Sequence, residues 1–114
     1  MRADLDGTAL EFFDGIEVCQ GGPLVFKLLV NNTLIEGHQF DASPLALEGE
    51  ILVPMRKRGF FKSGYVLARI DAETASVQVI SKVHEYMRLV RVEGPSVVFE
   101  TTAWGDQTAR CLIK

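Results

Sequence analysis

The sequence predicts an all-β fold, an antiparallel meander of about ten short strands that forms a barrel-like or strongly curled sheet. Two observations predict it: turn signals between runs of β-forming residues, and the alternation of apolar and polar residues within those runs. Asp-Gly and Asn-Asn pairs tolerate the positive φ angles of tight hairpin turns. The turn signals are Asp14-Gly15, Asn31-Asn32, Gly94-Pro95, Gly105-Asp106 and the looser Gly21-Gly22-Pro23.

The runs between these turns are predicted as strands. They cover residues 8–13, 16–20, 24–30, 33–37, 50–56, 64–70, 75–82, 85–93, 96–102 and 108–113. In the run 50–56, Ile51, Val53 and Met55 share one face, which is typical of a sheet that packs on a core from one side. The run 24–30 is apolar on both faces except at Lys27, which predicts a central strand covered on both sides.

Helix is expected only over residues 43–48, as at most one short turn. Ser43 can cap this turn, Pro44 suits its first position and Gly49 stops it. A meander of short strands must hide its edges, and closure into a barrel is the usual solution, with a two-layer sandwich as the alternative. The sole tryptophan, Trp104, is expected to cap one end of the core.

Length and composition favour one all-β domain that covers residues 1–114, with a packed core supported by the 47% hydrophobic content. No apolar run approaches the roughly 18 residues that span a membrane, and the polar N-terminus lacks a secretory signal. We therefore expect a cytoplasmic protein with no membrane partner. Cys19 and Cys111 are then expected to be reduced and buried, whereas export would favour a disulfide between them.

Charge is unevenly distributed along the chain, whose net charge is −3. Eight of the twelve basic residues, but only three of the fifteen acidic ones, lie between Met55 and Arg91. The densest stretch, the basic–aromatic segment, combines Arg56, Lys57, Arg58, Phe60, Phe61 and Lys62. Cations beside aromatic rings can bind nucleic acid, but the acidic overall balance disfavours that partner. Docking against an acidic protein or the acidic part of a second copy suits the asymmetry better.

No motif in the sequence names a chemistry. The leading hypothesis is therefore a non-catalytic binding or interaction module that forms a homodimer or another homo-oligomer, or binds an acidic partner. The basic–aromatic segment is its predicted contact surface, and no cofactor or metal is expected. A small anionic or apolar ligand is the other partner class that the sequence leaves open.

Two alternative functions remain. In the first, the barrel encloses an apolar cavity and carries a small ligand whose acidic head group meets Arg69, Arg88 or Tyr86. The second is a small metal- or histidine-dependent enzyme built on His38, Asp41 and His84. No His-x-His or Cys-x-x-Cys spacing supports a metal site.

Overall fold

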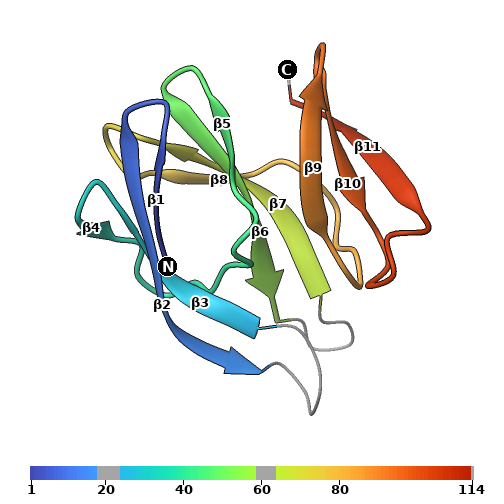
Figure 1. The fold of residues 1–114 in the computed structure, drawn as a ribbon, viewed down its shortest axis with the longest axis horizontal. Helices are drawn as coiled ribbons and strands as arrows, with labels where there is room; N and C mark the ends of the chain where they lie inside the picture. The colour runs from blue at the N-terminus through green and yellow to red at the C-terminus, as the bar shows by residue number, and fades with distance from the viewer. Residues whose placement is uncertain (18–23, 59–63, 114) are drawn as a thin grey trace.

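The protein is described by a computed structural model that places residues 1–17, 24–58 and 64–113 (Figure 1). All regular elements in these ranges are β-strands, and all their pairings are antiparallel. The same ranges contain no helix that is long and apolar enough to cross a membrane. The prediction of an all-β, antiparallel fold is confirmed.

The strands form three sheets (Figure 1). The first sheet has the order β1 (Arg2–Leu5), β2 (Thr8–Glu17), β3 (Leu24–Val30), β4 (Thr33–Leu34). The middle sheet has the order β5 (Leu45–Leu47), β6 (Glu50–Lys57), β7 (Gly64–Asp71), β8 (Val77–Val79). The third sheet has the order β11 (Thr108–Leu112), β10 (Ser96–Glu100), β9 (Arg88–Glu93). None of these sheets closes on itself within the described residues, so the barrel prediction is wrong.

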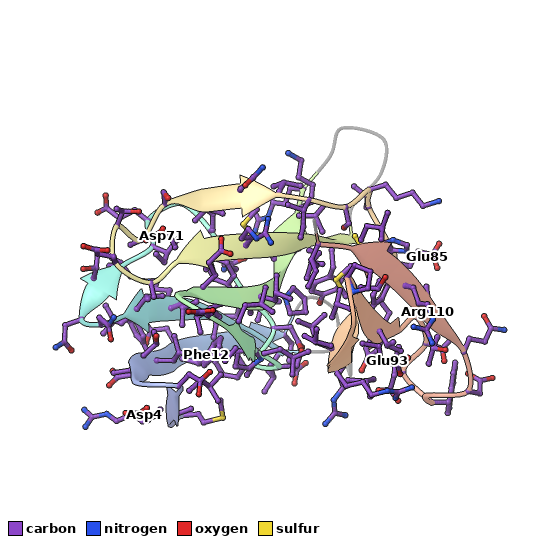
Figure 2. All side chains as sticks on the ribbon, turned by 90° about the horizontal axis from the view of Figure 1, so that it is seen from above. Asp4, Phe12, Asp71, Glu85, Glu93 and Arg110 are labelled. Atoms are coloured by element: carbon purple, nitrogen blue, oxygen red, sulfur yellow. The ribbon has the colours of Figure 1, made fainter. Side chains whose placement is uncertain are left out.

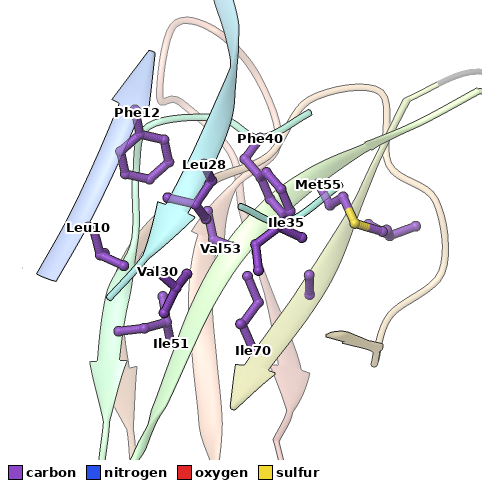
Figure 3. Packing of buried hydrophobic residues seen from close by; sticks show 12 residues of the cluster. Leu10, Phe12, Leu28, Val30, Ile35, Phe40, Ile51, Val53, Met55 and Ile70 are labelled. Carbon is purple, nitrogen blue, oxygen red and sulfur yellow. The ribbon is translucent and has the colours of Figure 1, made fainter. Parts of the chain in front are cut away.

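The middle sheet buries both of its faces, which is the physical reason why it is not the wall of a barrel. On one face Ile51, Val53 and Ile70 pack against side chains of β2 and β3 in a first core (Figure 3). On the other face Leu52 and Leu67 pack against side chains of β9 and β10 in a second core. β6 and β7 are therefore covered on both sides, although alternation along β6 predicted one apolar and one mixed face.

β3 is not the doubly covered strand that its sequence predicts. It buries Val25, Leu28 and Val30 but exposes Leu24 and Lys27. The apolar composition of this strand reflects its packing into the first core from one side, while the charged side chain of Lys27 reaches solvent. This strand therefore has one exposed position at which it can carry a function.

Phe40 joins the first sheet to the middle sheet. Its N–H donates to the carbonyl of Phe26 on β3, and its own carbonyl accepts from the N–H of Phe26, each at 2.8 Å. On its other side Phe40 forms a β-bridge with Met55 of β6. Residues 39–41, the bridging segment, thus lie between the two sheets, and the Phe40 side chain is fully buried in the first core (Figure 3).

Two of the predicted tight turns are confirmed. Asn31-Asn32 connects β3 to β4 with φ angles of 47° and 67°, and Gly94-Pro95 connects β9 to β10 with a φ of 56° at the glycine. Gly105-Asp106 lies within a longer connection, residues 101–107, between β10 and β11. The Gly21-Gly22-Pro23 break lies outside the described residues.

Asp14-Gly15, the clearest hairpin signal, is not a hairpin. β2 continues through it, and the register with β3 shifts between Phe13 and Ile16 as a β-bulge. A Cβ at Gly15 would lie 2.5 Å from the ring of Phe26, so close packing, in addition to turn chemistry, explains the glycine. The first hairpin instead turns at Asp6-Gly7, where both φ angles are positive (52° and 82°).

The predicted helical turn over residues 43–48 is also wrong, because residues 45–47 form β5 and pair with β6. The Ser43 hydroxyl does not cap a helix. It donates to the Asp41 carboxylate at 2.6 Å and accepts from the N–H of Leu89 at 3.3 Å, which ties the bridging segment to β9. Trp104 is 87% exposed in the connection 101–107, so it does not cap the core.

Replacing Phe40 with alanine should destabilise the fold by about 3–5 kcal/mol, because the change removes a fully buried ring between two sheets and leaves a cavity. The free energy of unfolding, measured by urea titration, checks this value. Trp104→Ala is the matched aromatic control, and its cost should stay within about 0.5 kcal/mol because the ring is exposed. Equal losses in the two variants would contradict the bridging role of Phe40.

Candidate functional site

A groove of about 510 Å³ opens where the bridging segment meets β3 and β6. We call its polar lining the basic groove; it consists of Lys27, His38, Gln39, Arg56, Lys57 and Arg58. These residues come from three separate parts of the chain. The N–H of Arg56 donates to the carbonyl of Gln39 at 2.8 Å, so the two backbones that carry most of the groove are directly bonded.

The basic groove concentrates positive charge that the molecule does not neutralise. None of the described residues that line it is acidic. Lys57 and Arg58 are exposed and form no ion pair with any residue in the described ranges. Lys27 pairs with Asp14 at 3.4 Å, and both side chains are more than half exposed. Such a site attracts anions and raises their local concentration.

Arg56 is the best-positioned cation of the groove. It is half-buried, and its Nη1 donates to Oε1 of Gln39 at 3.4 Å. A neutral amide leaves the guanidinium charge intact, and the remaining N–H donors of the fork stay available for a carboxylate or phosphate. Gln39 therefore acts as a positioning residue for Arg56.

A second hollow, of about 380 Å³, lies on β1 and β2 and has a different character. Its lining includes Arg2 together with Asp4 and Glu11, and Arg2 pairs with Glu11 at 2.6 Å. The charges of this hollow are balanced internally. It is therefore a weaker candidate for an anion or a cation site than the basic groove.

The predicted contact residues have different outcomes. Arg56, Lys57 and Arg58 line the groove, whereas Phe60, Phe61 and Lys62 lie outside the described residues. The two other predicted binding residues, Arg69 and Arg88, do not line it.

Arg69 and Arg88 have other neighbours. Arg69 forms an ion pair with Glu50 at 3.2 Å and donates to the carbonyl of Ile113, so it does not point into an apolar barrel. Arg88 is exposed at the start of β9 and lies close enough to Asp41 to favour its ionised form. The expectation that either arginine meets a ligand inside a closed barrel is wrong, because no barrel exists in the described part of the chain.

The two predicted histidines have different surroundings. His38 is exposed at the groove and contacts the ring of Phe40 edge to face at 6.3 Å. His84 pairs with Tyr65 through backbone hydrogen bonds of 2.7 and 2.8 Å, and its ring packs on Phe99 at 5.0 Å. Within residues 1–17, 24–58 and 64–113, no group of three or more His, Cys, Asp or Glu side chains could hold a metal ion.

Cys111 is half-buried, and its thiol donates to the carbonyl of Ile80 at 3.5 Å. Burial raises the pKa of this thiol, which lowers its reactivity. Cys19 lies outside the described residues, so its state stays a prediction.

The groove contains three residues that the sequence did not identify as a binding surface: Lys27, His38 and Gln39. Lys27 carried a signal, because it is the only charge in an otherwise apolar strand. His38 and Gln39 carried none, because their position depends on the hydrogen bonds of the bridging segment. None of the known protein-family models matches this chain, and no curated protein or solved structure matches it either.

Asp41, next to the groove, provides a pH test of the bridging segment. Burial raises the pKa of its carboxyl, although the hydrogen bond from Ser43 and the charge of Arg88 act in the opposite direction. A raised folded-state pKa means that folding favours the protonated form. The contribution of Asp41 to stability is therefore full below its unfolded pKa of about 3.9 and is lost as pH rises through the folded pKa.

The variant Asp41→Asn keeps an acceptor for Ser43 but removes the buried charge. Its free energy of unfolding, relative to wild type, should rise between about pH 3.5 and about pH 7. Glu93→Gln is a control of opposite sign, because hydrogen bonds from Arg110 and Arg91 lower the pKa of Glu93. Its relative stability should fall over the same range. Urea titrations at both pH values check the two trends, and a falling trend for Asp41→Asn would contradict the burial argument.

Proposed function

We propose that this chain is a non-catalytic binding module that holds an acidic partner in the basic groove. The observation that carries the proposal is the gathering of Lys27, Arg56, Lys57 and Arg58 around one groove whose described lining contains no carboxylate. Exposed cations without partners cost little to desolvate on one side and steer an acidic surface into contact. A binding role requires only these cations.

The chemistry of the groove favours binding over catalysis. His38 is the one described lining residue whose ordinary pKa lies near neutrality, and the described lining gives it neither a carboxylate nor a thiol as a neighbour. General acid–base catalysis normally requires such an orienting partner. Permanently charged arginine and lysine side chains instead suit the recognition of carboxylates or phosphates.

An acidic protein surface fits this chain better than nucleic acid, because the net charge of −3 repels a long polyanion beyond the groove. The volume of about 510 Å³ also falls within the range of small-molecule sites. A compact anionic ligand is therefore the second candidate. The two candidates differ in whether a small polyphosphate competes efficiently with an acidic peptide.

The proposal predicts that the charge of the groove controls binding of an acidic probe. A fluorescently labelled decaglutamate peptide should bind the wild-type protein at low salt, as measured by fluorescence anisotropy. Arg58→Glu should weaken this binding about tenfold, because it reverses an exposed charge at the groove without removing a core contact. Tripolyphosphate, added as competitor, measures how well the groove accepts a small anion.

Arg110→Glu is the matched control, because Arg110 lies on the third sheet, where it pairs with Glu93 at 2.9 Å (Figure 2). This variant changes the total charge equally but should alter the dissociation constant by less than about twofold. Equal weakening by the two substitutions would show that net charge alone drives binding. No weakening by Arg58→Glu would contradict the proposed site.

A further inference from the structure

The molecule carries an acidic surface that complements the basic groove. Three hairpin turns carry most of its carboxylates, which belong to Asp4, Asp6, Glu48, Asp71 and Glu73; we call this surface the acidic end (Figures 1 and 2). All of these residues are exposed except Asp71, which is half-buried. Backbone hydrogen bonds from Thr74 and Glu73 lower the pKa of Asp71, so its carboxylate stays ionised well below neutral pH.

Hydrogen bonds between the turns gather the acidic end into one surface. Oδ1 of Asn31 accepts from the N–H of Ala9 at 2.8 Å, and Nδ2 of Asn31 donates to the carbonyl of Ala72 at 3.1 Å. The N–H of Ala72 in turn donates to the carbonyl of Gly49 at 3.0 Å. The turns that follow β1, β3, β5 and β7 therefore lie together, and they share one end of the first and middle sheets (Figure 1).

The acidic end and the basic groove cannot neutralise each other within one copy. β6 leads from Glu50, next to the acidic end, to Lys57 in the groove, and eight residues of strand span about 23 Å at about 3.3 Å per residue. This separation exceeds the Debye length of about 10 Å at 0.1 M salt. Each copy therefore presents one unsatisfied surface of each sign.

We propose that the partner held in the basic groove is the acidic end of a second copy of this chain. This inference rests on the proposed function and names its partner. The two surfaces are complementary in charge, and the projecting turns of one copy face the hollow of the other. Because the contact joins two different patches, association is head to tail and can continue beyond a dimer.

Two variants that each lose one surface provide the test. Lys57→Gln/Arg58→Gln weakens the groove and leaves the acidic end intact, whereas Glu48→Gln/Glu73→Gln weakens the acidic end and leaves the groove intact. All four side chains are exposed, so we expect both variants to fold as the wild type does, which circular dichroism and urea titration check. Arg110→Gln is the control for an exposed cation outside both surfaces.

Sedimentation velocity of the full chain should show oligomers in about 0.01 M salt and monomers in about 1 M salt, where the Debye lengths are about 30 Å and 3 Å. Each double variant alone should associate about tenfold more weakly than wild type, and Arg110→Gln should match wild type. An equimolar mixture of the double variants should restore association but stop at a 1:1 dimer, because each such pair has one intact groove and one intact acidic end.

Three results would overturn the inference: a wild-type protein that stays monomeric at low salt, double variants that associate as strongly as wild type, or a mixture that associates no better than its components. None of them decides the proposed function, which depends on decaglutamate binding. A monomeric protein that still binds this peptide through Arg58 would retain the groove and lose only the second copy as its partner.

Discussion

The paired hydrogen bonds between Phe40 and Phe26 are the interaction on which the rest of the structure depends. They add the bridging segment to β3, and the bridge from Phe40 to Met55 adds the same segment to β6. Without this connection the first and middle sheets would share side-chain contacts but no backbone pairing. The fully buried ring of Phe40 then fills the core that the two sheets enclose.

The same connection creates the candidate site. Lys27 follows Phe26 on β3, Gln39 precedes Phe40, and Arg56 follows Met55 on β6. Each bridging pair therefore brings the next residue of its strand to one end of the junction. The basic groove is a consequence of where the bridging segment lies, because its cations flank the residues that form the bridge. A change that displaced the segment would disperse the charge even if every cation were kept.

The direction of the strands explains how one small molecule separates its charges. Short hairpins return the chain repeatedly to the same end, so Asp6, Glu48 and Glu73 meet although they are distant in sequence. β6 then carries the chain away from that end to Lys57 and Arg58. Each strand of the middle sheet is buried on both faces, so its surface charges are confined to its two ends.

Local patterns were sufficient for part of this structure. Alternation and turn chemistry predicted an all-β antiparallel chain, and the positive φ angles of Asn31-Asn32 followed from the side chains of two asparagines. The same reasoning failed at Asp14-Gly15, because a ring from a neighbouring strand occupies the space that a side chain would need. It also failed over residues 43–48, where pairing with β6 outweighed the capping preference of Ser43.

The sequence by itself determined the β character of the chain, its hairpin at Asn31-Asn32 and the presence of a dense run of cations at residues 56–58, because each depends on neighbouring residues alone. Only the tertiary structure decided that the strands form three stacked sheets in place of a barrel, and that Lys27 and His38 join those cations at one groove. The reason is that hydrogen bonds between residues distant in sequence place the bridging segment, and no local preference encodes which strands it will join.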